Sequence, residues 1–214
     1  MSKRDWIRGY RIVFALTTIF AMTYQCIHGY NNNADFKISN VLSFFTIQSN
    51  IIVAVVLLIA GLTSLGDHPT QRFEFVRGAA VAYIALVGVV YGVLLSGYQE
   101  ELQTTLPWVD TVVHRIIPLV MVADWLIDPP RSRIEFRQAL YWMIYPLVYL
   151  VYTLIRGPIV DWWPYPFLNP HHEDQGYGVV AIYCVGIAIG FMAFVWLVTW
   201  LSRREPEPAV VARA

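Results

Sequence analysis

The sequence predicts an all-α, polytopic transmembrane bundle of six helices, and two observations lead to this prediction. First, 57% of the 214 residues are apolar, only 14% are charged, and the mean hydropathy is +0.51. A soluble domain has fewer apolar and more charged residues. Second, six apolar segments are each long enough to cross a hydrocarbon core of ~30 Å as a helix. The expected helices span residues 11–28, 41–64, 75–97, 108–127, 136–155 and 177–201, within a single domain of residues 1–201, and the polar tail 202–214 is expected to be disordered.

The first segment starts with basic residues, as a signal peptide does. Its apolar run is longer than a signal-peptide core, however, and it ends in Tyr24-Gln25-Cys26-Ile27-His28-Gly29-Tyr30 without a small-x-small cleavage site. We therefore expect a retained helix at 11–28. The second segment, 41–64, follows a short polar loop and is the most informative stretch of the chain.

The next three helices differ in character. The segment 75–97 is rich in glycine and alanine, which suits close packing of helices. The segment 108–127 is the least apolar, because it contains Asp110, His114, Arg115 and Asp124. In 136–155, Pro146 is expected to kink the helix, since proline removes a backbone hydrogen bond.

The basic residues lie mostly on one side of the expected bundle. Six helices place both termini on the same side, and the opposite loops contain only Lys37 and Arg156 as basic residues. By the positive-inside rule, both termini are cytoplasmic. The basic residues on that side are Lys3, Arg4, Arg8, Arg11, Arg72, Arg77, Arg131, Arg133, Arg137, Arg203, Arg204 and Arg213.

Several classes of protein are disfavoured. The formal net charge of +0 argues against nucleic-acid binding, which needs clustered basic charge. Cys26 and Cys184 lie inside apolar segments and are expected to be packing residues rather than part of a disulfide framework or zinc motif. His171-His172-Glu173-Asp174 are adjacent on a loop, and adjacent residues rarely converge on one ion. We expect neither a metal nor an organic cofactor.

A polar stripe opens the second helix. In the stretch Ser43-Phe44-Phe45-Thr46-Ile47-Gln48-Ser49-Asn50, residues three and four apart share one helical face. Ser43, Thr46, Ser49 and Asn50 therefore form a stripe that a membrane helix does not turn toward lipid.

The topology places this stripe at the depth of a histidine. Thr46 is expected ~8 Å below the outer boundary of the second helix, and His114 ~9 Å below that of the fourth. Asp110 lies one turn above His114, and Asn50 one turn below Thr46. These four groups meet in one outer-leaflet layer if the two helices are neighbours. A threonine in a membrane helix is most often a packing residue, whereas an ionisable side chain within a span is a functional candidate.

The chain resembles a known family at three places. The stretch 43–50, the intramembrane His114, and Trp163-Pro164-Tyr165-Pro166-Phe167-Leu168 together look like the bacterial branch of the androgen-induced-protein family of six-helix integral membrane proteins. The resemblance covers roughly the second to the sixth helix. It implies a threonine-type hydrolase of fatty acid esters of hydroxy fatty acids, with the nucleophile at Thr46 and the histidine at His114. It also implies a multi-pass protein, in the cell (inner) membrane if the chain is bacterial.

We therefore predict an intramembrane lipid ester hydrolase near the outer leaflet, with membrane lipids and a hydrophobic ester substrate as its partners. Threonine is a poor nucleophile unless a neighbouring base accepts its proton, and neutral His114 can be that base for Thr46. The supporting residues are expected to be Asp110, which orients the imidazole, Asn50 as the oxyanion donor, and Arg156 and Ser49 as substrate-binding residues.

Two alternatives remain open. The same polar layer fits a non-catalytic membrane protein that binds or transports a lipid or small molecule, which interrupted helices would favour. A haem or metal protein needs paired axial histidines on facing helices, and only His28 and His114 approach membrane depth, so this alternative ranks last.

Overall fold

The computed structural model describes residues 2–98 and 106–202, and its regular elements are all helices. The all-α prediction is confirmed, since these two ranges contain no β-strand. The tail that was predicted to be disordered lies, from residue 203 onward, outside the described residues.

Within the described ranges, five segments are long and apolar enough to cross a membrane, which indicates a membrane-embedded protein. Four of them extend beyond the predicted bounds at one end or at both, whereas α3 is shorter than predicted. The five segments are α1 (Lys3–Asn32), α3 (Phe45–Leu62), α4 (Gln71–Val90) continued by the π-helix η2 (Tyr91–Leu95), α7 (Phe136–Ala139) joined through the 3₁₀-helix η4 (Leu140–Met143) to α8 (Ile144–Val160), and α9 (Gly176–Leu201).

The remaining predicted helix, 108–127, is present but is not among these five segments. It consists of α5 (Pro107–Thr111), the π-helix η3 (Val112–Ile116) and α6 (Ile117–Ile127). Pro118 explains the π-helix, because it has no N–H for the carbonyl group of His114. The N–H of Ile117 instead donates to the carbonyl group of Val112, five residues back. Gly88 of α4 lets the two helices approach here, since a Cβ atom on Gly88 would lie 3.0 Å from Cβ of Pro118.

The second helix begins later than predicted. A short helix, α2 (Ile38–Val41), precedes a break at residues 42–44, and α3 starts at Phe45. The hydroxyl group of Tyr149 donates to the carbonyl group of Ser43 at 2.9 Å, so that this carbonyl is paired outside the helix. Thr46 consequently lies in the first turn of α3 rather than more than one turn inside it.

The fifth helix is interrupted one turn before Pro146, at η4. Pro146 cannot donate to the carbonyl group of Trp142. That carbonyl accepts a hydrogen bond from the hydroxyl group of Tyr83 at 2.9 Å, so a neighbouring helix compensates for the missing donor.

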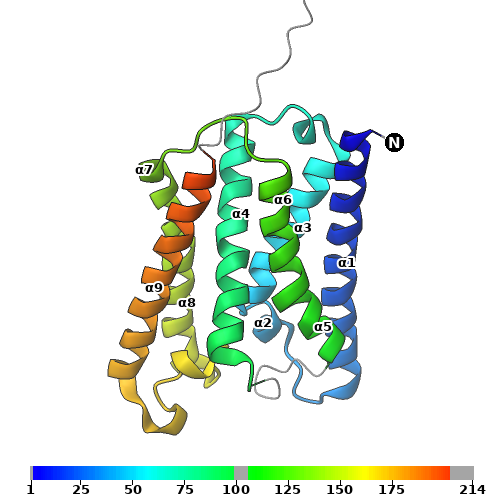
Figure 1. Ribbon diagram of the computed structural model, residues 1–214. Helices are drawn as coiled ribbons and strands as arrows, with labels where there is room; N and C mark the ends of the chain where they lie inside the picture. The colour runs from blue at the N-terminus through cyan, green and yellow to red at the C-terminus, as the bar shows by residue number, and fades with distance from the viewer. Residues whose placement is uncertain (1, 99–105, 203–214) are drawn as a thin grey trace, which may run out of the picture.

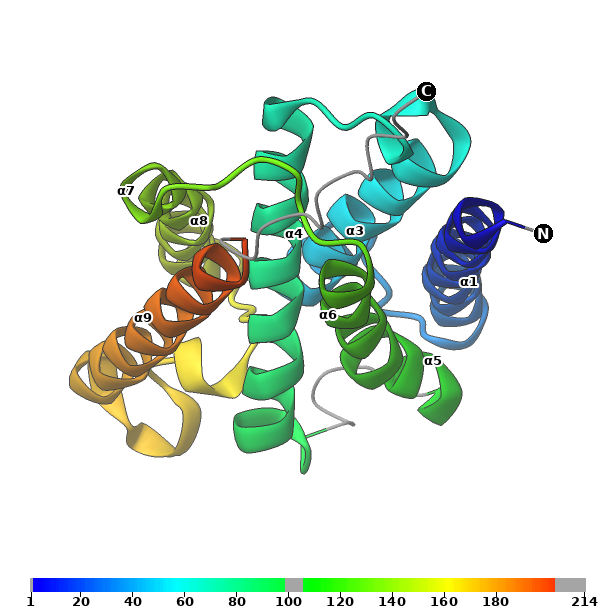
Figure 2. The same cartoon turned by 45° about the horizontal axis from the view of Figure 1, so that its top comes forward.

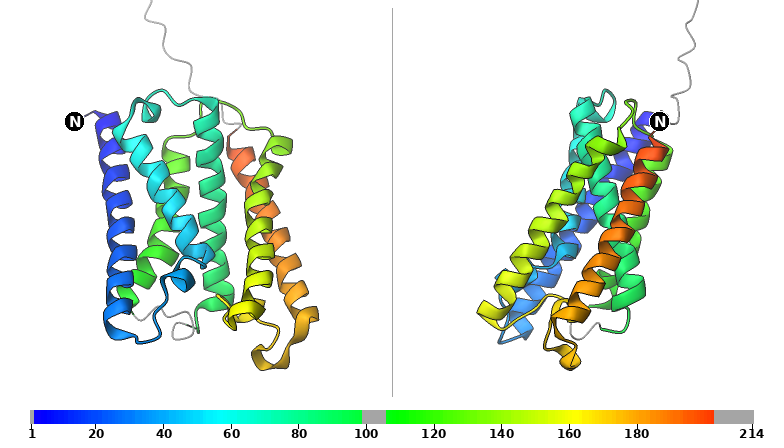
Figure 3. Two further views of the ribbon diagram at one scale, coloured as in Figure 1. Left: turned by 180° about the vertical axis from the view of Figure 1, so that it is seen from behind. Right: turned by 90° about the vertical axis from the view of Figure 1, so that its left-hand side faces the viewer.

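The bundle is arranged around α4, which contacts α3, α6 and α9 (Figures 1 and 2). Helix α1 packs along α3 on one side, and α8 and α9 lie on the other. Lys3 begins α1 and Leu201 ends α9 at the same end of the bundle, which we call the N-terminal end (Figures 1 and 3). The first turns of α5 and α9 lie toward the opposite end, and the chain also enters α3 from that side (Figures 1 and 3). The loops contain the short 3₁₀-helices η1 (Ser64–Gly66), η5 (Pro166–Leu168) and η6 (His172–Asp174).

Candidate functional site

Thr46 contacts a tyrosine from the loop between α8 and α9. Its backbone N–H donates to Oη of Tyr165 at 3.2 Å, and its Oγ1 lies 3.4 Å from the same oxygen. The first N–H groups of a helix have no partner within the helix, and Phe44, at the N-cap position, has no side-chain acceptor. Tyr165 therefore caps α3 from more than a hundred residues away. Tyr165 belongs to the Trp163–Leu168 motif, but its contact with Thr46 was not predicted.

Aromatic packing fixes the position of Tyr165. Its ring stacks on that of Phe167, with centroids 5.2 Å apart and an interplanar angle of 4°, and it meets the edge of Phe44. Trp163 lies flat against α8 at Gly157, where a Cβ atom would approach the indole to 2.5 Å. Only glycine leaves room for this contact, so Gly157 holds the loop against the bundle.

An apolar cavity of ≈ 110 Å³ adjoins Thr46 and Tyr165. Side chains of α4, α8 and α9, such as Leu86, Leu147 and Phe191, form most of its wall. The cavity is partly open, and Leu147 is 51% exposed on the surface of the bundle. Its shape and lining suit a hydrocarbon chain, with the two hydroxyl groups as its polar contacts.

A second, polar cavity of ≈ 310 Å³ lies on the loop between α8 and α9. Asp161, Asn169, His171 and His172 contribute to its wall. Tyr165 lines both the apolar and the polar cavity.

His114 is buried in η3 and is oriented by Asp110. Its Nδ1 lies 2.9 Å from Oδ1 of Asp110 and 3.2 Å from the carbonyl oxygen of the same residue. In the neutral ring, Nδ1–H donates to this carboxylate and Nε2 carries the lone pair. Nε2 forms no hydrogen bond with any residue that the structure describes.

Tyr91, which opens η2, completes this group and was not predicted. Its hydroxyl group donates to Oδ2 of Asp110 at 2.5 Å. Its ring stacks on the imidazole of His114, with centroids 4.1 Å apart and an interplanar angle of 12°. Tyr91 and His114 both lie in π-helical segments, which are frequent at functional sites.

Asn50 shows that α3 and η3 are neighbours, which the sequence left open. Its Nδ2 donates to the carbonyl group of Thr46 at 2.9 Å and to that of Val113 at 3.2 Å. One amide thus joins the turn of Thr46 to the turn of His114. Both of its N–H groups are used, so the geometry leaves no free amide proton for the predicted oxyanion role.

The predicted pair is close in the fold but is not hydrogen bonded. In the described part of the chain no hydrogen bond joins Thr46 to His114, because the hydroxyl faces Tyr165 and the imidazole faces Asp110. The side chain of Ser49 is fully buried, and its Oγ has no partner among the described residues.

Arg156 lies at the same end of the bundle, half-buried beside the loop after α8. Its Nη2 donates to Oδ1 of Asn40 at 2.7 Å, and its guanidinium group lies over the ring of Trp162 at 5.1 Å. None of the ion pairs within residues 2–98 and 106–202 involves Arg156. The guanidinium group is therefore available to a ligand carboxylate.

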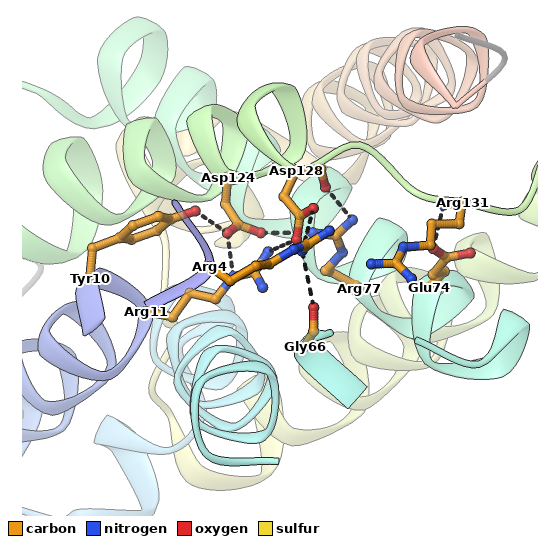
Figure 4. Close-up of polar contacts among 9 residues, drawn as sticks. All are labelled: Arg4, Tyr10, Arg11, Gly66, Glu74, Arg77, Asp124, Asp128 and Arg131. Atoms are coloured by element: carbon orange, nitrogen blue, oxygen red, sulfur yellow. Dashed lines mark hydrogen bonds and ion pairs between the residues drawn. The ribbon is translucent and has the colours of Figure 1, made fainter. Parts of the chain in front are cut away.

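A second polar cluster lies at the N-terminal end, where Asp124 is fully buried (Figure 4). Its Oδ1 accepts hydrogen bonds from Nε of Arg11 at 2.6 Å and from the hydroxyl group of Tyr10. Its Oδ2 accepts from Nη1 of Arg77 at 3.0 Å. The contacts continue to the carboxylate group of Asp128, and the cluster joins α1, α4 and α6. We call Arg4, Tyr10, Arg11, Arg77, Asp124 and Asp128 the Asp124 network.

The loop after α6 is fixed next to this network. Glu74 of α4 accepts the backbone N–H of Arg131 at 2.5 Å and that of Ser132 at 2.8 Å (Figure 4). In the sequence, the arginines of the network indicate only the topology. Their partner lies far away in the chain, so spacing could not reveal the pairing.

In the described ranges, no group of three or more His, Cys, Asp or Glu residues could hold a metal ion. Comparison with known proteins matches no family model, no curated protein and no solved structure.

Proposed function

We propose that this chain is an intramembrane lipid ester hydrolase, with Thr46 as the nucleophile and His114 as the general base. The Asn50 bridge is the observation that carries the proposal, because one amide binds the carbonyl group of Thr46 and that of Val113, next to His114. The resemblance of residues 43–50 and 163–168 to the androgen-induced-protein family supports the same two residues. It suggests fatty acid esters of hydroxy fatty acids as the substrate.

The proposal includes a six-helix topology. The two carboxylates of the segment 107–127 have partners inside the bundle, because Asp110 accepts hydrogen bonds from His114 and Tyr91 and Asp124 pairs with Arg11 and Arg77, so this segment can serve as a further span. The positive-inside rule then makes the N-terminal end cytoplasmic and places Thr46 in the outer leaflet. In a bacterium, this membrane is the cell (inner) membrane.

The reaction proceeds by acyl transfer to Thr46. Oγ1 bonds to the ester carbonyl carbon as its proton passes to Nε2 of His114, and the carbonyl π electrons move to oxygen. Collapse of this intermediate breaks the bond to the alcohol oxygen, which takes the proton from His114. Water then attacks acyl-Thr46 with the same base, which releases the fatty acid and restores the hydroxyl group. Asp110 holds Nδ1–H and stabilises the imidazolium that forms in both steps.

Catalysis by Thr46 and His114 requires a rearrangement when the substrate binds. The hydroxyl of Thr46 must turn from Tyr165 toward Nε2 of His114, or a water must join the two. Catalytic hydrogen bonds are often long in empty sites and tighten in the substrate complex.

The two cavities suit an ester that has an apolar and a polar part. The acyl chain would lie in the apolar cavity between α4, α8 and α9, and the polar cavity would supply water. Arg156 would pair with a free carboxylate of the substrate, and Ser49 would supply a further buried hydroxyl group.

The test compares the full chain with Thr46→Ala and Thr46→Ser in lipid nanodiscs. Turnover of p-nitrophenyl octanoate should fall to background in Thr46→Ala and persist in Thr46→Ser, which keeps the hydroxyl group. A fluorophosphonate should label Thr46 in the wild type, as read by peptide mass spectrometry. Wild-type turnover in Thr46→Ala would reject the nucleophile.

The second candidate function is non-catalytic binding or transport of a lipid or small molecule. The lack of a hydrogen bond between Thr46 and His114 in the described structure, beside a mainly apolar cavity, favours it. A wild-type protein that binds a fluorescent fatty acid in nanodiscs, but neither hydrolyses esters nor reacts with the fluorophosphonate, would decide for this function.

A further inference from the structure

The hydroxyl group of Tyr165 lies beside the proposed nucleophile, and we propose that Tyr165 is a catalytic residue that donates the hydrogen bond to the oxyanion. This inference rests on the proposed function and completes it, because acyl transfer needs a donor where negative charge develops on the carbonyl oxygen. The resemblance that identified Thr46 and His114 assigned no role to Tyr165.

The distance from the nucleophile is suitable. Oη of Tyr165 lies 3.4 Å from Oγ1 of Thr46. In the tetrahedral intermediate, the oxyanion and Oγ1 are bonded to the same carbon. A donor that contacts Oγ1 in the empty site can therefore contact the oxyanion, where donors act at about 2.7–3.1 Å. When the hydroxyl of Thr46 turns toward His114, the proton of Tyr165 becomes available.

The surroundings make Tyr165 a strong donor. Its oxygen accepts the N–H of Thr46 at 3.2 Å, at the positive end of α3. Accepting one hydrogen bond polarises a hydroxyl group and strengthens the bond that it donates. Burial also raises the pKa of the Tyr165 phenol above its ordinary value, so the proton stays in place at neutral pH.

Most other donors near Thr46 are already occupied, and Ser49, whose Oγ has no partner among the described residues, lines neither cavity. Both N–H groups of Asn50 bind backbone carbonyls, and the N–H of Thr46 itself binds Tyr165. Tyr149 also lines the apolar cavity, but its hydroxyl group donates to the carbonyl group of Ser43 at 2.9 Å.

Tyr165 is also positioned where an ester carbonyl would lie. It lines both the apolar and the polar cavity, and Thr46 lines the apolar one, so an ester with its acyl chain in the apolar cavity can present its carbonyl group to Tyr165 and Thr46. Stacking on Phe167 and the contact of Trp163 with Gly157 hold the ring rigidly. Such preorganisation is what makes an oxyanion donor effective.

The main experiment compares Tyr165→Phe with Tyr145→Phe, a matched loss of one hydroxyl group from a tyrosine that lines neither cavity and donates to Oε1 of Gln48 at 2.6 Å. In the full chain in nanodiscs, with p-nitrophenyl octanoate, Tyr165→Phe should lower kcat about 100-fold. KM should change little, because the lost interaction forms in the transition state. Tyr145→Phe should keep kcat within a few fold. A wild-type kcat in Tyr165→Phe would overturn the inference.

A series of fluorotyrosines at position 165 separates catalysis from capping. If Tyr165 donates to the oxyanion, kcat should vary systematically with the acidity of the phenol. If Tyr165 only caps α3, Tyr165→Phe should lower Tm, and kcat should not follow acidity across the series. That result would also overturn the inference.

The activity of Thr46→Ala shows whether only the role of Tyr165 is wrong or the proposed function as well. An inactive Thr46→Ala beside a fully active Tyr165→Phe rejects only the role of Tyr165. An active Thr46→Ala, or a wild type that is neither active nor labelled by a fluorophosphonate, rejects both.

Discussion

The polar layer around Thr46 and the Asp124 network lie at opposite ends of one bundle and differ in how their polar atoms are paired. In the network, both oxygens of Asp124 accept hydrogen bonds, from groups on α1 and α4. Around Thr46, Oγ of Ser49 and Oδ1 of Asn50 are buried without partners among the described residues, and Nε2 of His114 is also unbonded there.

The difference separates two uses of polar groups inside an apolar bundle. A paired network stabilises one arrangement of helices, because moving any helix leaves a buried charge without its partner. Polar atoms without a protein partner cost stability and are retained where a ligand or a reaction uses them. The network has one such atom of its own, Nε of Arg77, but this guanidinium group lies over the ring of Trp125 at 4.8 Å.

The largest effect is expected at the oriented imidazole. Asp110→Asn should keep the fold but favour the wrong tautomer of His114, and we expect kcat to fall by about 10³- to 10⁴-fold. Ester turnover in nanodiscs measures this, with the unfolding temperature as a control. A loss of folding without a specific loss of kcat would make Asp110 a structural residue like Asp124.

The next effect is expected in the Asp124 network and should concern stability. Asp124→Ala leaves the guanidinium groups of Arg11 and Arg77 buried without their carboxylate, which should cost about 3–5 kcal/mol in the free energy of unfolding. Denaturant unfolding in detergent micelles measures the change. If Asp124→Ala has the same free energy of unfolding as the wild type, the network does not hold the helices together. The contrast between a stabilising network and the polar layer around Thr46 would then be lost.

A smaller effect on activity is expected from Tyr91→Phe. The substitution keeps the ring that stacks on His114 and removes the hydrogen bond to Asp110. A hydrogen bond to a charged group contributes about 1.5–3 kcal/mol, so we expect kcat to fall by about 10- to 100-fold. Tyr83→Phe, which removes a hydroxyl from the same helix away from His114, is the matched control. Equal losses in both variants would contradict a specific role for Tyr91.

The smallest effect is expected at the rim of the network. The side chain of Arg4 is 42% exposed, and its guanidinium group pairs with Asp128 at 3.1 Å. Exposed ion pairs contribute about 1 kcal/mol or less, so Arg4→Gln should change stability by no more than that. Unfolding measured alongside Asp124→Ala tests the ranking, and comparable losses would show that burial does not set the strength of these pairs.

Local features of the sequence predicted much of the fold. The apolar segments could be predicted as helices because a hydrophobic run of this length is a property of one continuous stretch of chain. The interruption near Pro146 was predicted because proline has no N–H group to donate. The π-helix at 112–116 follows from Pro118 for the same reason. The start of α3 was placed four residues too early, because the carbonyl group of Ser43 pairs with a tyrosine of another helix.

The candidate site was predicted only in part. Thr46 and His114 were predicted as site residues because polar and ionisable side chains are unusual in apolar helices. Tyr91 and Tyr165 were not predicted, since tyrosine is common at membrane interfaces and its role depends on what its hydroxyl group contacts. The role of Asn50 likewise depends on what its amide group meets. The amide protons bind carbonyl groups on two separate helices, which the predicted oxyanion role did not take into account.

The sequence by itself determined the all-α class, the positions of the apolar helices and the presence of polar groups within them. Each of these depends on residues that are near one another in the chain. The tertiary structure decided which polar groups meet: Asn50 with Val113, Tyr165 with Thr46, and Arg11 and Arg77 with Asp124. These pairs form across helices, where packing sets both distance and direction, and no local pattern in the chain specifies either.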